Sequence, residues 1–292
     1  MTPPQISVVV AVQFAQANLP AILAALGPGL ADGRAEVLVC HAADDPVALP
    51  RQPGLRAVTG AADARIPDLW RDGILAATAE RVAILSAHCV PAADWLDVAC
   101  GLDIAGLGGI GGRIVNDPGA DAAGTAVHLL RYHAVAGAGA PRAVHDIAAD
   151  NAVYRRDAIL ACADLLPGGF WEPAYHARFR ARGLGLALHP ALAVTHVNRY
   201  TPGQFMRQRR LHGRNFGQTR ALAAPPARRW LMLAAAPAGF AVFALKLTRA
   251  VLRNPALRRD WRRAWPWLYL FMANWSWGEV RGHADAVFGR RE

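Results

Sequence analysis

The first 115 residues alternate short, valine-rich apolar runs with segments of helical periodicity. Ile6–Val12 reads ISVVVAV, which is typical of a strand buried on both faces of a sheet. Such a strand needs helices on both sides, so it restricts the architectures open to the chain. Further strand-like runs are Glu36–Cys40, Leu55–Val58, Val82–Leu85 and Ile110–Val115, and the helix-like segments are Asn18–Leu26, Asp68–Thr78 and Trp95–Leu107. The sequence therefore predicts an α/β fold with a Rossmann-like, mostly parallel sheet flanked by helices.

The net charge of +10 is distributed unevenly along the 292 residues. Residues 1–198 carry 14 basic against 18 acidic side chains, and residues 199–292 carry 18 against 4. A mildly acidic body is thus followed by a strongly basic tail. The four cysteines form no CxxC pair and no zinc-type spacing, which predicts free thiols in a reducing cytoplasm.

Two apolar segments lie inside the basic tail. Trp230–Leu245 has 16 residues without a charge, and Ala264–Gly278 is a second such segment; six of the nine tryptophans fall between residues 230 and 277. Both segments are shorter than the roughly 20 residues of a membrane-spanning helix. We expect residues 223–292 to form an apolar helical hairpin that associates, monotopic or re-entrant, with the anionic cytoplasmic face of a bacterial inner membrane. Two helices buried in a soluble protein are the alternative, and the apolar segments argue against nucleic acid as the partner.

Several motifs occur in a characteristic order along the body of the chain. The opening ISVVVAVQFAQANLPAILAAL is followed by EVLVC at 36–40, AILSAHCVPAADWL at 83–96, DNAVYRRDAIL at 150–160 and PGGFWEPAYHARFRARG at 167–183. Together they resemble glycosyltransferase family 2, whose members share the GT-A fold. The resemblance covers about residues 5–222, which we interpret as one glycosyltransferase-type domain.

The resemblance implies transfer of a hexose from a nucleotide-sugar donor to a lipid-linked or glycan acceptor, with inversion, as in cell-envelope polysaccharide biosynthesis. Departure of the nucleoside diphosphate develops negative charge, which a divalent cation (Mg²⁺ or Mn²⁺) or basic side chains must stabilise. Inverting transfer also needs a carboxylate base near the acceptor hydroxyl.

This chain differs from the family where its acids usually stand. In the D-x-D alignment, Ser86 and His88 occupy the two aspartate positions, and His41 stands where the second strand usually leads into aspartates. At the family's E-D site Glu172 is retained, but Pro173 replaces the aspartate. Glu172 is therefore the candidate base, with a helix-start acid as the alternative. The missing acids leave a second interpretation open, a catalytically inactive pseudo-glycosyltransferase that acts as a scaffold or binds a partner or ligand.

The remaining candidates follow from motif position and side-chain chemistry. The donor-binding candidates are Ala11, Gln13, His41, Trp70, Ser86, Ala87 and His88. The candidates for the acceptor or donor sugar are Asp150, Asn151, Trp171 and His176. Arg207, Arg210 and Arg214 share one helical face that could hold the diphosphate or face a membrane. His88 and His196 are the candidate metal ligands, although hard cations prefer oxygen ligands.

Overall fold

The computed structural model describes residues 3–289, which fall into two units. The first unit holds the chain up to Asp117 together with Val135–Val197, and the second holds Pro118–Ala134 and the chain from Asn198 onward. The domain boundary that the sequence suggested, at residue 222, falls inside the second unit. Residues 1–2 and 290–292 of the two expected domains lie outside the described residues.

Among the described residues, the first unit is built on one nine-stranded sheet. Its strands are β1 Ile6–Val12, β2 Ala35–Ala42, β3 Leu55–Gly60, β4 Arg81–Ser86, β5 Cys89–Pro91, β6 Leu107–Asn116, β7 Arg142–Val144, β8 Asn151–Arg155 and β9 Gly185–His196. Their order is β3-β2-β1-β4-β8-β6-β9-β5, and β7 pairs with β9. The predicted α/β fold with a central sheet flanked by helices is confirmed.

The sheet is mixed, whereas the sequence predicted mostly parallel strands. β3, β2, β1 and β4 are parallel, as are β6 and β9. In contrast, β8 is antiparallel to both β4 and β6, and β5 and β7 are antiparallel to β9. The apolar pattern of β8 is that of any strand buried on both faces, so the pattern identifies the strand but not its direction.

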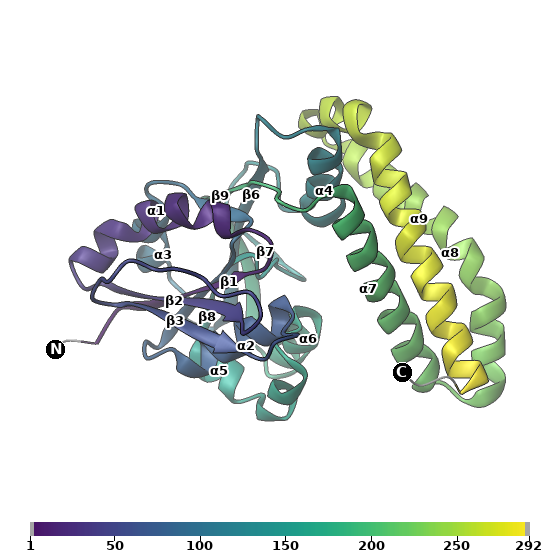
Figure 1. The fold of residues 1–292 in the computed structure, drawn as a ribbon, viewed down its shortest axis with the longest axis horizontal. Coiled ribbons are helices and arrows are strands. Elements are labelled where there is room, and N and C mark those ends of the chain that lie inside the picture. Colours follow the sequence, from purple (N-terminus) through teal and green to yellow (C-terminus); the bar gives the residue numbers. More distant parts are fainter. Residues whose placement is uncertain (1–2, 290–292) are drawn as a thin grey trace. The chain divides into compact units, whose positions relative to one another are not determined.

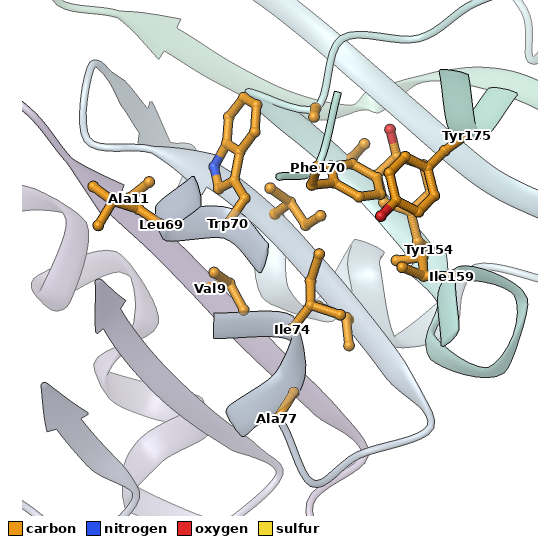
Figure 2. Packing of buried hydrophobic residues seen from close by; sticks show 14 of the residues in the cluster. Val9, Ala11, Leu69, Trp70, Ile74, Ala77, Tyr154, Ile159, Phe170 and Tyr175 are labelled. Carbon is orange, nitrogen blue, oxygen red and sulfur yellow. The ribbon is translucent and has the colours of Figure 1, made fainter. Parts of the chain in front are cut away.

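Helices cover both faces of this sheet (Figure 1). Helices α1 Leu19–Ala31 and α3 Trp95–Gly101 lie on one face, and α2 Ile66–Ala76, α5 Arg156–Leu160 and α6 Glu172–Ala181 lie on the other. Figure 2 shows the core on the α2 side, where Trp70 and Ile74 of α2 pack near Val9 of β1. Helix α3 ends six residues before the predicted Leu107, because Leu102 adopts an extended conformation.

The second unit is helical. It contains α4 Ala122–Tyr132, α7 Pro202–Leu222, α8 Pro226–Arg253 and α9 Arg258–Phe288, and α9 lies between α7 and α8 (Figure 1). Helices α8 and α9 form the predicted C-terminal hairpin, joined by a 3₁₀ turn at Pro255–Leu257. Helix α7 starts with a capping box between Thr201 and Gln204.

Glycines bring α7 and α9 into backbone contact. Gly213 and Gly217 on α7 face Gly278 and Gly282 on α9, so each helix carries its glycines four residues apart. A Cβ on Gly213 would lie 2.0 Å from the carbonyl oxygen of Trp275, and one on Gly278 would lie 2.0 Å from that of Arg210. Any side chain at these positions forces the helices apart, which explains why α7 belongs to the helical unit rather than to the sheet.

Within the described residues, one helix is long and apolar enough to cross a membrane by length and composition. This helix is α8, which has 28 residues and continues beyond the 16-residue apolar segment seen in the sequence. Most of its apolar stretch is exposed rather than packed inside the unit.

Candidate active site

The carboxyl ends of β1 and β4 form the centre of the candidate site. The chain leaves β1 toward β2 on one side, whereas the segments after β4 build the sheet on the other side. In open α/β sheets, ligands bind in the crevice outside strand ends where the order reverses in this way. Gln13 follows β1 directly, and Ala87 and His88 follow β4.

Hydrogen bonds hold the segment after β4 in place. The amide of Ala87 donates to the carbonyl oxygen of Ala11 at 2.8 Å, and His88 Nε2 lies 3.1 Å from the carbonyl oxygen of Gln13. The Asn18 side chain donates to the carbonyl oxygens of Ala87, at 2.9 Å, and Val197, at 3.0 Å. This segment is therefore an ordered floor between the two strand ends.

Most of the donor-binding candidates are buried near these strand ends rather than exposed on a surface. Ala11, His41, Trp70, Ser86, Ala87 and His88 are all buried. Trp70 Nε1 donates to the carbonyl oxygen of Leu85 at 2.9 Å, and His41 Nδ1 lies 2.8 Å from the carbonyl oxygen of Ala42. Of the set, only Gln13 is partly exposed.

Two loops beside these strand ends carry accessible side chains. Phe14 has an exposed ring and a φ of 59°, in the left-handed region that non-glycine residues rarely adopt. The Gln16 amide donates to the Asp45 carboxylate, which joins the loop after β1 to the loop after β2. Backbone strain of this kind concentrates at ligand-binding sites. No pattern in the sequence indicated the conformation of Phe14.

The two candidate metal ligands, His88 and His196, lie near each other. Their ring centroids are 6.1 Å apart, and His196 is fully buried at the end of β9. Within residues 3–289, no group of three or more His, Cys, Asp or Glu side chains is placed to hold a metal ion. Two imidazoles without a carboxylate do not fit Mg²⁺ or Mn²⁺, which prefer oxygen ligands.

Asn151 lies at the start of β8, but its side chain is used inside the protein. Its Oδ1 accepts from Trp95 Nε1 at 2.8 Å, and its Nδ2 donates to the carbonyl oxygens of Arg113, at 3.0 Å, and Leu192, at 2.8 Å. The residue is 0% exposed. Asn151 therefore connects β8 with α3, β6 and β9, and its side-chain amide is hydrogen-bonded inside the protein. Asp150 precedes it and lies beside the end of β4.

Glu172 is a partly exposed carboxylate at the first position of α6. Its Oε1 accepts from the amide of Ala149 at 3.3 Å, which places it next to Asp150 and the loop that leads into β8. The preceding turn is held against α2, because Phe170 donates its amide proton to the carbonyl oxygen of Pro67 at 2.8 Å.

The same turn requires glycine and positions an aromatic ring. Gly169 has a φ of 87°, and a Cβ there would lie 2.8 Å from Asp68 Oδ1. The guanidinium of Arg65 lies 5.5 Å from the ring centroid of Trp171, which is partly exposed. Trp171 is thus presented beside Glu172, as a residue that contacts a sugar face must be.

His176, one turn after Glu172, is fully buried and serves a hydrogen-bond chain. Its Nδ1 lies 3.1 Å from Asp146 Oδ1, and its Nε2 lies 3.1 Å from the Tyr154 hydroxyl. Burial lowers the pKa of His176, although the Asp146 carboxylate opposes this. Burial, together with the negative charges of Glu172, Asp150 and Asp146, raises the pKa of Tyr154. Three acids therefore lie near the hydrogen-bonded chain of Asp146, His176 and Tyr154. His176 is a buried member of this chain, next to the part of the site that holds Asp150 and Glu172.

The three candidate diphosphate arginines lie on α7, in the second unit. Arg214 Nε forms an ion pair with Asp285 Oδ2 at 2.6 Å, and Arg210 Nη2 donates to Asn274 Oδ1 at 2.9 Å. Arg207 is exposed. Two of the three guanidiniums thus contribute to the packing of α7 against α9.

Solved structures provide the comparison for this architecture, since neither a family model nor a curated protein sequence matches the chain. A mannosyltransferase from Pyrobaculum calidifontis, solved with GDP-mannose and Mn²⁺, matches with a TM-score of 0.51 and 16% identity. The match covers 100% of this chain and 89% of the other. The chain has a GT-A-like glycosyltransferase fold.

A second solved structure matches with a lower TM-score. Residues 1–349 of S. aureus TarS match with a TM-score of 0.44 and 12% identity, over 98% of this chain and 92% of the other. At 16% identity the likeness to the mannosyltransferase establishes the fold and not the chemistry.

Proposed function

We propose that this GT-A-like protein transfers a hexose from a nucleoside-diphosphate sugar to a hydroxyl of a lipid-linked or membrane-proximal glycan acceptor, with inversion at the anomeric carbon. The observation that carries the proposal is the position of Glu172, a partly exposed carboxylate beside Asp150 at the edge where β4 ends. The likeness to a mannosyltransferase solved with GDP-mannose supports the donor class.

In this mechanism Glu172 accepts the proton of the acceptor hydroxyl. The oxygen then attacks the anomeric carbon from the face opposite the nucleoside diphosphate, and the bond to the diphosphate breaks with its electron pair leaving on the phosphate oxygen. Trp171 lies against the sugar, and Asp150 orients its hydroxyl groups. The nucleotide binds to Gln13 and against the buried residues that follow β1 and β4.

The charge of the leaving diphosphate is balanced mainly by the protein. The two imidazoles of His88 and His196 do not form a suitable site for Mg²⁺ or Mn²⁺. Arg210 and Arg214 hold α7 against α9 through Asn274 and Asp285, so neither is proposed as a diphosphate partner.

The composition of the second unit supports a membrane-proximal acceptor and a membrane location. Its basic, tryptophan-rich helices suit a protein that works on the cytoplasmic face of the inner membrane, where lipid-linked glycans of the cell envelope are assembled. Basic side chains attract anionic lipids, and exposed tryptophans favour the membrane interface.

A pseudo-glycosyltransferase is the second candidate, favoured by the burial of Ser86, Ala87 and His88 where the family carries its acids. Such a protein would bind a nucleotide sugar or a partner protein without turnover. A transfer assay separates the two functions. Purified protein is incubated with GDP-mannose, UDP-glucose or UDP-galactose and a bacterial lipid extract, and nucleoside-diphosphate release is measured.

A matched pair of variants identifies the base. Glu172→Gln should reduce turnover by about 10²–10⁴-fold, the usual contribution of a general base. Glu80→Gln, at an exposed acid outside the site, should leave turnover unchanged. Near-normal turnover in Glu172→Gln would reassign the base, and no turnover with any donor would favour the pseudoenzyme.

A further inference from the structure

Helix α8 presents an apolar face away from the rest of its unit. We define this outward face by residues Trp230, Leu231, Ala234, Ala235, Ala238, Ala241, Val242 and Leu245, all of which are exposed. Leu231 is 71% exposed, and Trp230 is 55% exposed. The opposite face, with Ala236, Leu247 and Val251, is buried. Contiguous exposed apolar surface of this kind marks a binding surface.

Cations lie at both ends of the outward face, and α8 contains no acidic residue. Arg228 precedes it, and Lys246, Arg249 and Arg253 follow it; all four are exposed. An apolar strip between clusters of positive charge complements the surface of an anionic bilayer, where lipid tails meet negative headgroups.

The length and composition of α8 also suit a crossing helix, but its neighbours exclude that orientation. Helices α8 and α9 run antiparallel, with Trp230 5.5 Å from Phe288 and Phe243 5.6 Å from Trp275 between ring centroids. The Thr248 hydroxyl lies 2.7 Å from that of Tyr269. The apolar middle of α8 therefore lies alongside residues 275–288 of α9.

That part of α9 carries a charge cluster shared with α7, in which Glu279, His283 and Asp285 are buried and Arg220 is exposed. Glu279 Oε1 lies 3.5 Å from Arg220 and 3.7 Å from His283, and Arg214 pairs with Asp285 at 2.6 Å. A Cβ on Gly239 of α8 would lie 3.4 Å from Glu279 Oε2, so this cluster is level with the middle of α8.

If α8 crossed a bilayer, this cluster would lie at hydrocarbon depth. The cost is about 2.5–3.5 kcal/mol for each charged side chain at the centre of a membrane helix. The span between the flanking cations is also short, since Arg228 to Lys246 is roughly 27 Å of helix against a hydrocarbon core of about 30 Å. Both considerations favour a helix that lies in the plane of the membrane surface.

We propose that α8 is an in-plane membrane-docking helix, whose outward face inserts into one leaflet of an anionic bilayer while α7 and the charge cluster of α9 stay in the water phase. The proposal uses contacts of the second unit alone and holds whether or not the protein transfers sugar. Helix α8 is the surface that contacts the membrane, and it does not cross the bilayer.

Vesicle flotation tests the surface. Full-length protein is mixed with vesicles of phosphatidylcholine alone or with 30% phosphatidylglycerol. Binding to the anionic vesicles is expected, and Leu231→Glu/Val242→Glu should weaken it at least tenfold. The matched control Leu211→Glu, at an exposed leucine on α7, should change it less than twofold. Thermal unfolding in the absence of lipid verifies that each variant is folded.

A second measurement does not rely on charged variants. In a Cys100→Ser background, the variants Leu231→Cys and Leu211→Cys carry an environment-sensitive dye. A blue shift with anionic vesicles is expected at position 231 and not at 211. Equal shifts at both positions, or equal binding to both vesicle types, would overturn the proposal.

Orientation is read from the two ends of α8. Arg228→Cys and Arg253→Cys, in the same background, are treated with a membrane-impermeant maleimide added outside vesicles that already carry the protein. Both ends should react at similar rates. Protection of one end would show that α8 crosses. A lipid-free dimer that Leu231→Glu dissociates would show that a second copy covers this face; either result refutes the proposal.

Discussion

His88 Nε2 lies 3.1 Å from the carbonyl oxygen of Gln13 and so joins the ends of β1 and β4. A carbonyl oxygen only accepts hydrogen bonds, so Nε2 carries the proton in this arrangement. That nitrogen has no lone pair for a metal ion, so His88 could bind one only through Nδ1, and a single imidazole nitrogen is a poor ligand for Mg²⁺.

Donor binding should therefore depend weakly on divalent cations. Excess Mg²⁺ should raise the affinity for a nucleoside diphosphate by less than about tenfold, which corresponds to roughly 1.4 kcal/mol. Titration calorimetry with GDP and UDP in EDTA, and again in Mg²⁺ or Mn²⁺, measures this. A larger gain in affinity would show that carboxylates bind the cation, and Asp44 and Asp45 would be the first candidates.

Asn151 should matter for stability more than for binding. Asn151→Ala leaves Trp95 Nε1 and two carbonyl oxygens without their partner, and each buried group left unsatisfied costs about 1–3 kcal/mol. We expect the free energy of unfolding to fall by at least ~2 kcal/mol in urea titrations. A loss within about 0.5 kcal/mol would mean that the side chain is not part of the core.

The glycine contacts between α7 and α9 give a paired test. Gly278→Ala places a methyl group 2.0 Å from the carbonyl oxygen of Arg210, so the helices must separate. Overpacking of this kind costs about 1–3 kcal/mol. Gly203→Ala, in the first turn of α7 with nothing within 4 Å, is the control and should be neutral or stabilising. Similar melting temperatures for both variants would contradict the packing.

Acid should destabilise the second unit through His212. Burial, with the charges of Arg209 and Arg131, lowers the pKa of His212 to about 4. The unfolded side chain titrates near 6.5, so between pH 6.5 and 4 the unfolded chain binds a proton that the folded chain does not. Stability should fall as the pH drops through this window, by about 3 kcal/mol in all for this group.

Urea unfolding at several pH values measures that loss, with His212→Gln as the comparison. The variant should keep more of its stability at pH 4.5 relative to pH 7.5. The unfolding free energy of the variant should still fall somewhat as the pH drops, because burial also lowers the pKa values of His133 and His176. If the unfolding free energy of the variant and of the parent protein changed equally with pH, His212 would be excluded as a source of the acid destabilisation.

The strand and helix pattern of the first unit was predictable, because burial on both faces leaves a continuous apolar run such as Ile6–Val12. Strand direction was not predictable. Strand β8, for example, has the apolar pattern of a buried strand but runs antiparallel to both β4 and β6. The assignment of α7 to the sheet domain also did not agree with its contacts in the structure. Its glycines pack against glycines some 65 residues away, a relationship that no local period reveals.

The candidate site shows the same limit at the level of single side chains. The sequence predicted the strand ends and suggested Glu172 as the base, because motif order marks them. It could not reveal that Asn151 is surrounded by partners from residues 95, 113 and 192, or that His176 pairs with Asp146. Burial and hydrogen bonding between distant segments decide which polar residues remain available to a ligand.

Hydrogen–deuterium exchange with a panel of nucleotide sugars tests the central claim most directly, because it locates binding without requiring turnover. The site at the ends of β1 and β4 should bind at least one nucleoside-diphosphate sugar, and amide exchange should slow in the loops after β1 and β2, residues 13–16 and 43–45. Unchanged exchange in both loops with every donor at millimolar concentration would contradict a nucleotide-sugar site in this protein.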